Sequence, residues 1–236
     1  MTDKHTLRIF DEDLKALSGE IVNLANQVDE ELEQAIEALI SANAALAAVV
    51  IDSDRRVDDL QDRVNAHTTR TLARQQAMAD DLRAIFAAAR IAPHLERIGD
   101  YAKNTAKRSK RLGAPIDAEV AAQFLWMGMR IGAMLRRVTE AYSRHDAEQA
   151  NVAWSDDAEL DAVYAKLFEH LLARMREDSA YVADGTQLLF IAKGLERAGD
   201  HVTDIAEEVY LMVTGRPLQG PRPKVDETGA TSDPTS

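Results

Sequence analysis

The sequence predicts an all-α protein made of two tandem, pseudo-symmetric three-helix bundles. Three observations support this fold class. Ala, Leu, Glu and Arg, which favour helices, dominate the chain. The alternation of β-branched or aromatic residues that is typical of strands is not seen over any useful length. A six-residue motif also returns 100 residues later, which indicates an internal duplication.

Apolar periodicity and helix-ending residues place the individual helices. We expect short helical segments near 44–51 and 147–154, and long helices at about 10–40, 54–77, 80–112, 117–144, 157–178 and 182–214. Gly113 and Pro115 separate the third long helix from the fourth, and Asp117 is a candidate N-cap. Pro93 lies inside the third long helix, where it removes one backbone hydrogen bond and can kink the helix.

Two pairs of matching segments define the repeat. The motif LERIGD at 95–100 returns as LERAGD at 195–200, and IDSDRRVD at 51–58 parallels WSDDAELD at 154–161. We therefore expect a first three-helix repeat at 1–113 and a second at 114–214. The remaining segment, 215–236, is rich in Gly, Pro, Thr, Ser and charge, and its composition predicts a disordered tail.

Composition and charge exclude several classes of function. Cysteine is absent, which excludes disulfide scaffolds, Cys-ligated zinc and thiol nucleophiles. A net charge of −12 argues against binding to nucleic acid and against adsorption to anionic lipid. The longest stretch without charge, 38–51, is shorter than the roughly 18 residues that cross a bilayer, and 1–10 lack a secretory apolar segment. We therefore expect a cytoplasmic protein without direct membrane insertion.

Acidic residues recur at helical spacing in both repeats. Residues four apart share one face of a helix, so neighbouring helices can gather four carboxylates at the edge of each bundle. Such carboxylates repel unless protons or cations intervene, and oxygen ligands suit iron, manganese, zinc or magnesium. An ordinary solvated acidic face is the plainer alternative, but the pattern occurs twice, each time beside a mid-helix glycine, Gly99 or Gly199. The rows are Asp54 and Asp58; Glu96, Asp100 and Asn104; Asp157 and Asp161; and Glu196, Asp200 and Asp204.

Other candidates are weaker. The six histidines form no His-Glu-x-x-His and no Glu-x-x-His pair, which disfavours a ferritin-like di-iron oxidase. His201 follows Asp200 and could reach the acidic site, although it is most simply a surface histidine, and His94 gives only slight support to phosphotransfer chemistry. The basic end of the third helix, with Lys103 and Arg108, complements the helix dipole or forms a docking patch. The Met- and aromatic-rich fourth helix, 117–144, packs in the core or supplies a partner surface or a homodimer seam.

These motifs resemble those of the PhoU family of phosphate-signalling regulators. The resemblance covers about residues 7–214 and rests on the acidic pair of each second helix and the Glu-Arg-x-Gly-Asp of each third helix. It implies a cytoplasmic, typically dimeric protein that binds multinuclear metal. It also implies repression of the phosphate-starvation response, through the ATPase subunit of the phosphate ABC transporter and a sensor histidine kinase, without enzymatic activity of its own.

The resemblance further implies two metal sites. The first comprises Asp54, Asp58, Glu96 and Asp100, with Asn104 one turn further on, and the second comprises Asp157, Asp161, Glu196, Asp200 and Asp204. Through its partners the protein is expected at the inner membrane. The alternative function is a carboxylate-bridged metalloenzyme or a metal-storage bundle.

Overall fold

The computed structural model describes residues 2–74, 79–155 and 158–218. Within these ranges the secondary structure is helical and contains no strand. The first bundle comprises α1 (Thr2–Ile40), α2 (Ala44–Arg74) and α3 (Ala79–Ser109). The second comprises α4 (Ala118–Arg144), α5 (Ala147–Ser155), α6 (Ala158–Glu177) and α7 (Val182–Thr214), with a 3-10 turn at Ser179–Tyr181. The all-α prediction is confirmed.

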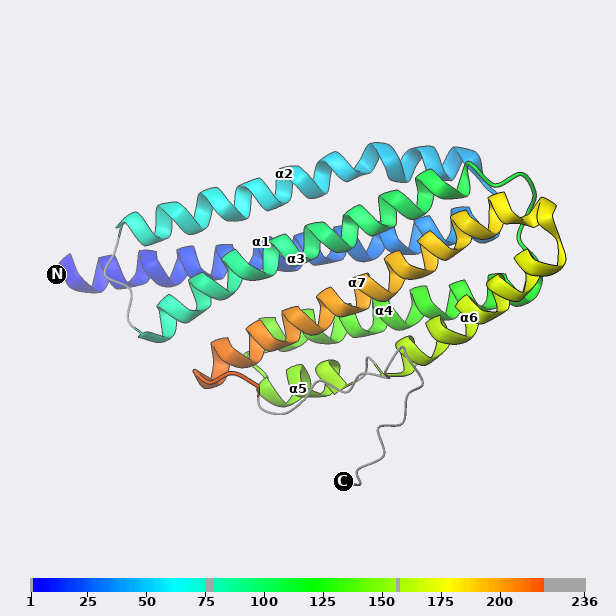
Figure 1. Cartoon of the computed structure of the whole chain (residues 1–236). Helices are drawn as coiled ribbons and strands as arrows, with labels where there is room; N and C mark the ends of the chain where they lie inside the picture. Colours follow the sequence, from blue (N-terminus) through cyan, green and yellow to red (C-terminus); the bar gives the residue numbers. More distant parts are fainter. Residues whose placement is uncertain (1, 75–78, 156–157, 219–236) are drawn as a thin grey trace, which may run out of the picture.

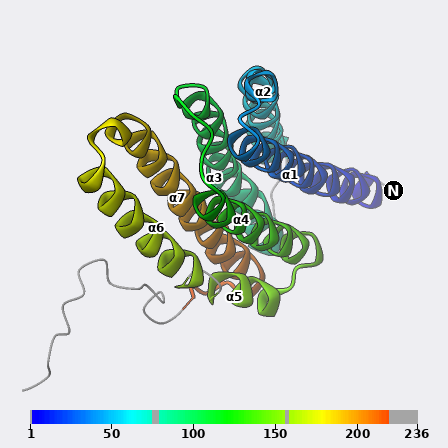
Figure 2. The same cartoon turned by 90° about the vertical axis from the view of Figure 1, so that its right-hand side faces the viewer.

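The two bundles lie side by side along their length (Figure 1). Helices α1, α2 and α3 pack on one another, and α7 packs on α4, α5 and α6. The bundles meet where α1 contacts α4 and where α3 contacts α7, while α2 and α6 lie on opposite outer flanks (Figure 2). Contacts of Arg90 with Glu208 and of Arg108 with Gln187 show that α3 and α7 run antiparallel.

The duplication is visible in the helix boundaries, but the two copies differ in one element. An offset of 103 residues carries the first residue of α2 onto the first of α5 and the last residue of α2 onto the last of α6. The expected break between 44–51 and 54–77 is therefore wrong, because α2 is continuous from Ala44 to Arg74. In the second copy α5 ends at Ser155 and α6 begins at Ala158, while 156–157 lie outside the described residues, as do the last residues of the expected helix 54–77.

The cores of the two bundles are built on equivalent positions. Buried residues of α1 have buried counterparts in α4 at the same offset of 103, such as Leu17 and Val120. One pair differs in chemistry: Glu31 of α1 is 1% exposed, and its counterpart is Met134 of α4, which is equally buried. The first bundle therefore contains a buried carboxylate where the second contains an apolar thioether.

A glycine sets the contact between α1 and α4. A Cβ atom at Gly128 would lie 2.7 Å from Cγ1 of Ile36, closer than side-chain carbons approach one another. The absence of a side chain at Gly128 therefore lets the two bundles pack closely along this contact.

The segment after Thr214 begins with residues that contact the bundle. Gly215 adopts the left-handed conformation at φ 69°, and its N–H donates to the Leu211 carbonyl at 2.9 Å, so it caps α7. Leu218 is half-buried against the core. The prediction that the tail starts at residue 215 is therefore wrong for these first residues, and 219–236 lie outside the described residues.

None of the helices within the described ranges combines the length and the apolar character that membrane spanning requires.

These contacts predict different effects for two truncations. A chain that ends at Leu218 should keep the thermal midpoint of the full chain, because the composition of 219–236 offers little apolar surface to bury. A chain that ends at Thr214 should lose about 1 kcal/mol, or about 2–4 °C, since it lacks the Gly215 cap and the packing of Leu218. Differential scanning calorimetry of the three chains checks this, and equal midpoints for both truncations would contradict the role of Gly215 and Leu218.

Candidate functional site

The structure brings four predicted carboxylates of the first repeat together, on the faces of α2 and α3 that meet. We call Asp54, Asp58, Glu96 and Asp100 the first acidic cluster. A Cβ atom at Gly99 would lie 3.2 Å from Cγ1 of Val57, so the glycine permits a close approach of the two helices at this level. Gly99 lies next to Asp100, and Val57 lies between Asp54 and Asp58. A glycine in the middle of a helix costs about 1 kcal/mol relative to alanine, and Gly99 stands where the acids of the two helices converge.

A lysine ammonium group lies among these carboxylates. Lys103 Nζ donates to Asp100 Oδ1 at 2.5 Å and to Asp54 Oδ2 at 2.7 Å. Burial alone lowers the pKa of Lys103, but the hydrogen bonds to the two carboxylates outweigh burial and raise that pKa. Lys103 is therefore a permanent internal cation of the first cluster, a role that its position near the end of α3 did not reveal.

A fifth carboxylate lies behind the cluster. Glu31 of α1 is buried and accepts a hydrogen bond from Gln27 Nε2 at 3.1 Å. Burial raises the pKa of Glu31, and the Asp54 carboxylate raises it further. The sequence analysis missed Glu31, although its place among Val28, Leu32 and Ala35 on the apolar stripe of α1 was an available signal.

The remaining carboxylates of the first cluster repel one another despite the lysine. Burial and the Asp100 carboxylate raise the pKa of Glu96, and burial and Asp54 raise that of Asp58. Burial also acts to raise the pKa of Asp100, but its hydrogen bond from Lys103 lowers it below the usual value. The cluster therefore retains an unbalanced negative charge that a proton or a cation relieves.

The second repeat forms a comparable group of carboxylates, in which the lysine precedes the Glu-Arg-x-Gly-Asp motif instead of following it. The second acidic cluster comprises Asp161 of α6 with Glu196 and Asp200 of α7. Glu196 is 7% exposed, and Lys193 Nζ lies 2.9 Å from its Oε2. Burial raises the pKa of Glu196, Asp200 and Asp161 add to this, and Lys193 opposes it. Asp157, which was also predicted as a ligand of this cluster, lies outside the described residues.

Two predicted ligands lie elsewhere, in the seam between the bundles. Asn104 is exposed and lines a groove with Arg108 of α3 and Phe190 of α7. Asp204 Oδ2 lies 3.5 Å from His94 Nδ1 and 3.4 Å from His201 Nδ1. The reason is helical geometry, since each step of four residues turns about 40° around the axis. Asn104 and Asp204 lie two such steps after Glu96 and Glu196. Their side chains therefore turn about 80° away from the acidic cluster of their own bundle and toward the seam.

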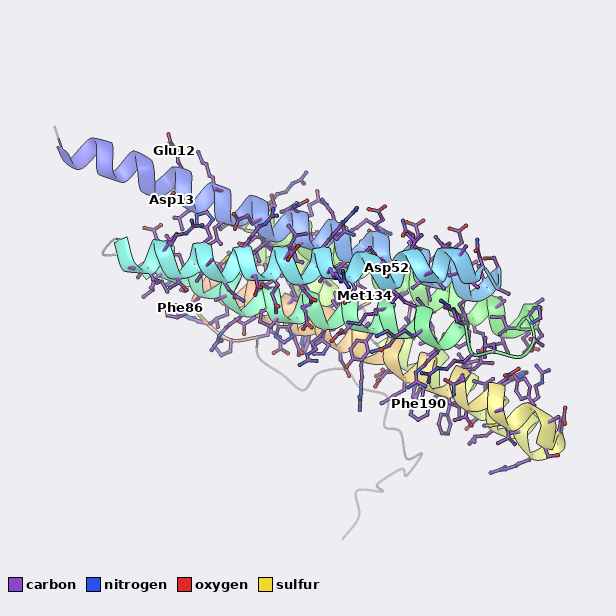
Figure 3. All side chains as sticks on the ribbon, turned by 90° about the horizontal axis from the view of Figure 1, so that it is seen from above. Glu12, Asp13, Asp52, Phe86, Met134 and Phe190 are labelled. Atoms are coloured by element: carbon purple, nitrogen blue, oxygen red, sulfur yellow. The ribbon has the colours of Figure 1, made fainter. Side chains whose placement is uncertain are left out.

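The structure also gives partners in the seam to two polar residues outside the clusters, His201 and Arg108. His201 is paired with His94 of α3, so its interpretation as an ordinary surface histidine is wrong. Arg108, assigned to a basic helix end, donates to Gln187 Oε1 at 2.9 Å, and its guanidinium lies 4.3 Å from the centroid of the Phe190 ring. Phe86 and Phe190 are themselves exposed side chains of α3 and α7 (Figure 3).

A family model described as the PhoU domain matches the chain twice, at residues 21–109 and 124–209. The chain belongs to the PhoU family. The two matched segments contain the first and second acidic clusters, which therefore lie inside the part of the chain that the family shares. They also contain His94 in the first match and His201 in the second.

Relatives match this PhoU-family chain along nearly its full length. It is 38% identical over 236 residues to a phosphate-specific transport system accessory protein PhoU homolog of Rhizobium meliloti, covering 100% of each chain. It is 38% identical over 214 residues to the protein of the same name from Zymomonas mobilis, covering 91% and 90%. The crystal structure of PhoU from Pseudomonas aeruginosa superposes with a TM-score of 0.83 at 28% identity, covering 88% of this chain and 100% of that one.

The buried carboxylate of Glu31 predicts a pH-dependent gain in a Glu31→Gln variant. Below the unfolded pKa of about 4.5 both states bind the proton, so the carboxyl costs little. As pH rises through the raised folded pKa, the wild type loses stability, whereas glutamine has no charge to bury. The variant should therefore gain stability relative to the wild type between about pH 4 and about pH 8 in urea unfolding.

Glu33→Gln on the exposed side of α1 is the matched control and should show no such dependence. A difference between wild type and Glu31→Gln that is independent of pH would contradict a buried, charged Glu31.

Proposed function

We propose that this chain is a non-enzymatic accessory regulator of a phosphate-specific transport system. The observation that carries the proposal is the end-to-end similarity to the Rhizobium meliloti protein, which is named an accessory protein of that system. The two tandem PhoU-domain matches support the same assignment, because both halves of the chain are of this family.

The regulation that we propose is negative. The protein represses phosphate uptake and the phosphate-starvation response when phosphate is plentiful, through the ATPase subunit of the phosphate ABC transporter and a sensor histidine kinase. It acts in the cytoplasm and reaches the inner membrane through those partners. It does so as a homodimer, for which the exposed Leu125, Trp126 and Met129 of α4 supply an apolar surface.

We also propose that the two acidic clusters hold metal ions. The donor set fits, because carboxylate oxygens gather on closely packed helices, and the ammonium groups of Lys103 and Lys193 already lie there as cations. Asp54, Asp58, Glu96 and Asp100 would hold ions in the first cluster, and Asp161, Glu196 and Asp200, with Asp157, in the second. Iron, manganese, zinc and magnesium suit these ligands, and pairs at i and i+4 can bridge two ions. A bound cation would neutralise the excess negative charge.

Deletion of the protein in its host tests the regulatory proposal. A phosphate-starvation reporter should become constitutive in phosphate-rich medium, because the repressing contact with the transporter and the kinase is lost. Complementation with the full chain, or with the chain that ends at Leu218, should restore repression. If the reporter of the deletion strain is switched off normally in rich phosphate, the regulatory proposal is wrong.

Loss of carboxylates tests the metal proposal. Protein purified without chelator should lose iron, manganese or magnesium when Glu96→Ala, Asp100→Ala, Glu196→Ala and Asp200→Ala are combined, while the helical circular dichroism persists. The matched control removes four exposed acids outside the clusters and should keep its metal: Asp52→Ala, Asp59→Ala, Glu169→Ala and Glu177→Ala. Elemental analysis measures both, and equal metal content in the two variants would refute the ligand assignment.

A further inference from the structure

Two histidines and an aspartate meet at the seam between the bundles, outside both acidic clusters. His94 comes from α3, and His201 and Asp204 come from α7. The Nδ1 atoms of the two histidines lie 3.0 Å apart, and Asp204 Oδ2 lies 3.5 Å from one and 3.4 Å from the other. Three atoms that can act as metal ligands thus form a nearly equilateral triangle.

The size of this triangle matches the ligand shell of a small divalent ion. Nitrogen and oxygen ligands lie about 2.0–2.2 Å from zinc, so two ligands at tetrahedral angles stand roughly 3.3–3.6 Å apart. Two of the separations, 3.4 and 3.5 Å, lie within this range, and the third, 3.0 Å, is slightly shorter. A hydrogen bond between the two imidazoles, together with an ion pair from Asp204 to a protonated imidazole, is the arrangement without metal that fits the same separations, and the zinc titration below distinguishes the two.

Neighbouring groups hold the site in place. The Tyr101 ring stacks on His201 with centroids 6.0 Å apart and planes inclined by 23°, which supports one face of the imidazole. Two further carboxylates of α7 near His94 already have partners: Glu208 Oε1 pairs with Arg90 at 3.1 Å, and Glu207 Oε1 accepts from Trp154 Nε1 at 2.9 Å. Asp204 Oδ2 lies within 3.5 Å of the Nδ1 atoms of both histidines, and this geometry assigns it to the site.

The duplication gives the contact between α3 and α7 two equivalent halves, and the three ligands occur in only one of them. At the offset of 100, His94 corresponds to Gly194, His201 to Tyr101 and Asp204 to Asn104. At that equivalent place a Cβ atom on Gly194 would lie 3.5 Å from the Tyr101 ring, so the ring fills the space where an imidazole pair would lie. The packing of α3 on α7 does not itself require histidines, because the other half of the same interface is built without them.

We propose that His94, His201 and Asp204 bind one borderline divalent ion, represented by zinc, which joins α3 to α7. Two imidazole nitrogens and one carboxylate oxygen are a ligand set that zinc uses when a fourth position is left open. The side chains of His94, His201 and Asp204 are 28%, 24% and 38% exposed, so an ion can enter from solvent and water can complete the shell. The nitrogen ligands distinguish this site from the all-oxygen clusters and favour zinc over magnesium or manganese.

Titration of the full chain with zinc and cobalt(II), after removal of metal with chelator, tests the site. His94→Gln combined with His201→Gln should lower the zinc stoichiometry by one ion per chain in equilibrium dialysis. The same pair should abolish the visible ligand-field bands of cobalt(II) that nitrogen ligands intensify. His170→Gln, a histidine that lies 3.8 Å from Glu119, is the matched control and should change neither result.

The quadruple alanine variant of the acidic clusters separates this proposal from the previous one. It should retain one zinc per chain, and addition of His94→Gln and His201→Gln should remove that ion. Zinc should raise the thermal midpoint of the quadruple variant, and this rise should disappear when His94→Gln and His201→Gln are added. In the presence of chelator the two variants should have equal midpoints. Unchanged stoichiometry and unchanged cobalt spectra in the double histidine variant would show that the histidines only hydrogen-bond to each other.

Discussion

Repulsion among carboxylates that are held against an apolar core is the constraint on which the site depends. Close packing of α3 on α2 at Gly99 brings the acids of both helices to one place, where Asp54 is buried and Glu96 and Asp100 are partly shielded from water. A lysine ammonium group lies beside the carboxylates of each bundle and compensates part of their charge: Lys103 in the first and Lys193 in the second. Burial is the largest cause of the raised pKa values of Glu96 and Glu196, and the neighbouring carboxylates Asp100 and Asp200 raise them further in spite of the lysines.

The two copies share their packing and differ in their polar chemistry. Lys103 corresponds to Thr203, whose hydroxyl donates to the Asp200 carbonyl at 2.7 Å, and Lys193 corresponds to Pro93. Each bundle therefore acquired its cation at a different position, on opposite sides of the same Glu-Arg-x-Gly-Asp motif. The buried Glu31 exists only in the first copy. The apolar core tolerates little change in volume, whereas charged positions at its edge can be exchanged as long as the local charge is compensated.

Sequence periodicity was sufficient for most helix positions and for the duplication. It also placed Asp54 with Asp58 on one face of α2, and Glu96 with Asp100 on one face of α3, since all of these follow from spacing within single helices. Periodicity alone was insufficient where the partner lies on another helix: that these two faces meet was inferred from the adjacency of the helices, and the partners of His94 and Lys103 were not found. His94 and His201 are 107 residues apart, and their contact depends on the register of α3 against α7. The repeat itself obscured the pair, because aligning the copies places each histidine opposite a residue that is not histidine.

The acidic clusters and the proposed zinc site also differ in which bundles supply their ligands. The first acidic cluster takes its side chains from helices of one bundle, so an ion there stabilises that bundle alone. His94 and His201 come from different bundles, and zinc between them would be sensitive to the position of α3 relative to α7. Linkage is reciprocal, so a partner that shifts α7 against α3 must change the affinity for zinc by the same factor as zinc changes the affinity for that partner. If the protein acts through its contacts, as proposed, a single ion between α3 and α7 would in this way transmit a change at one surface to another.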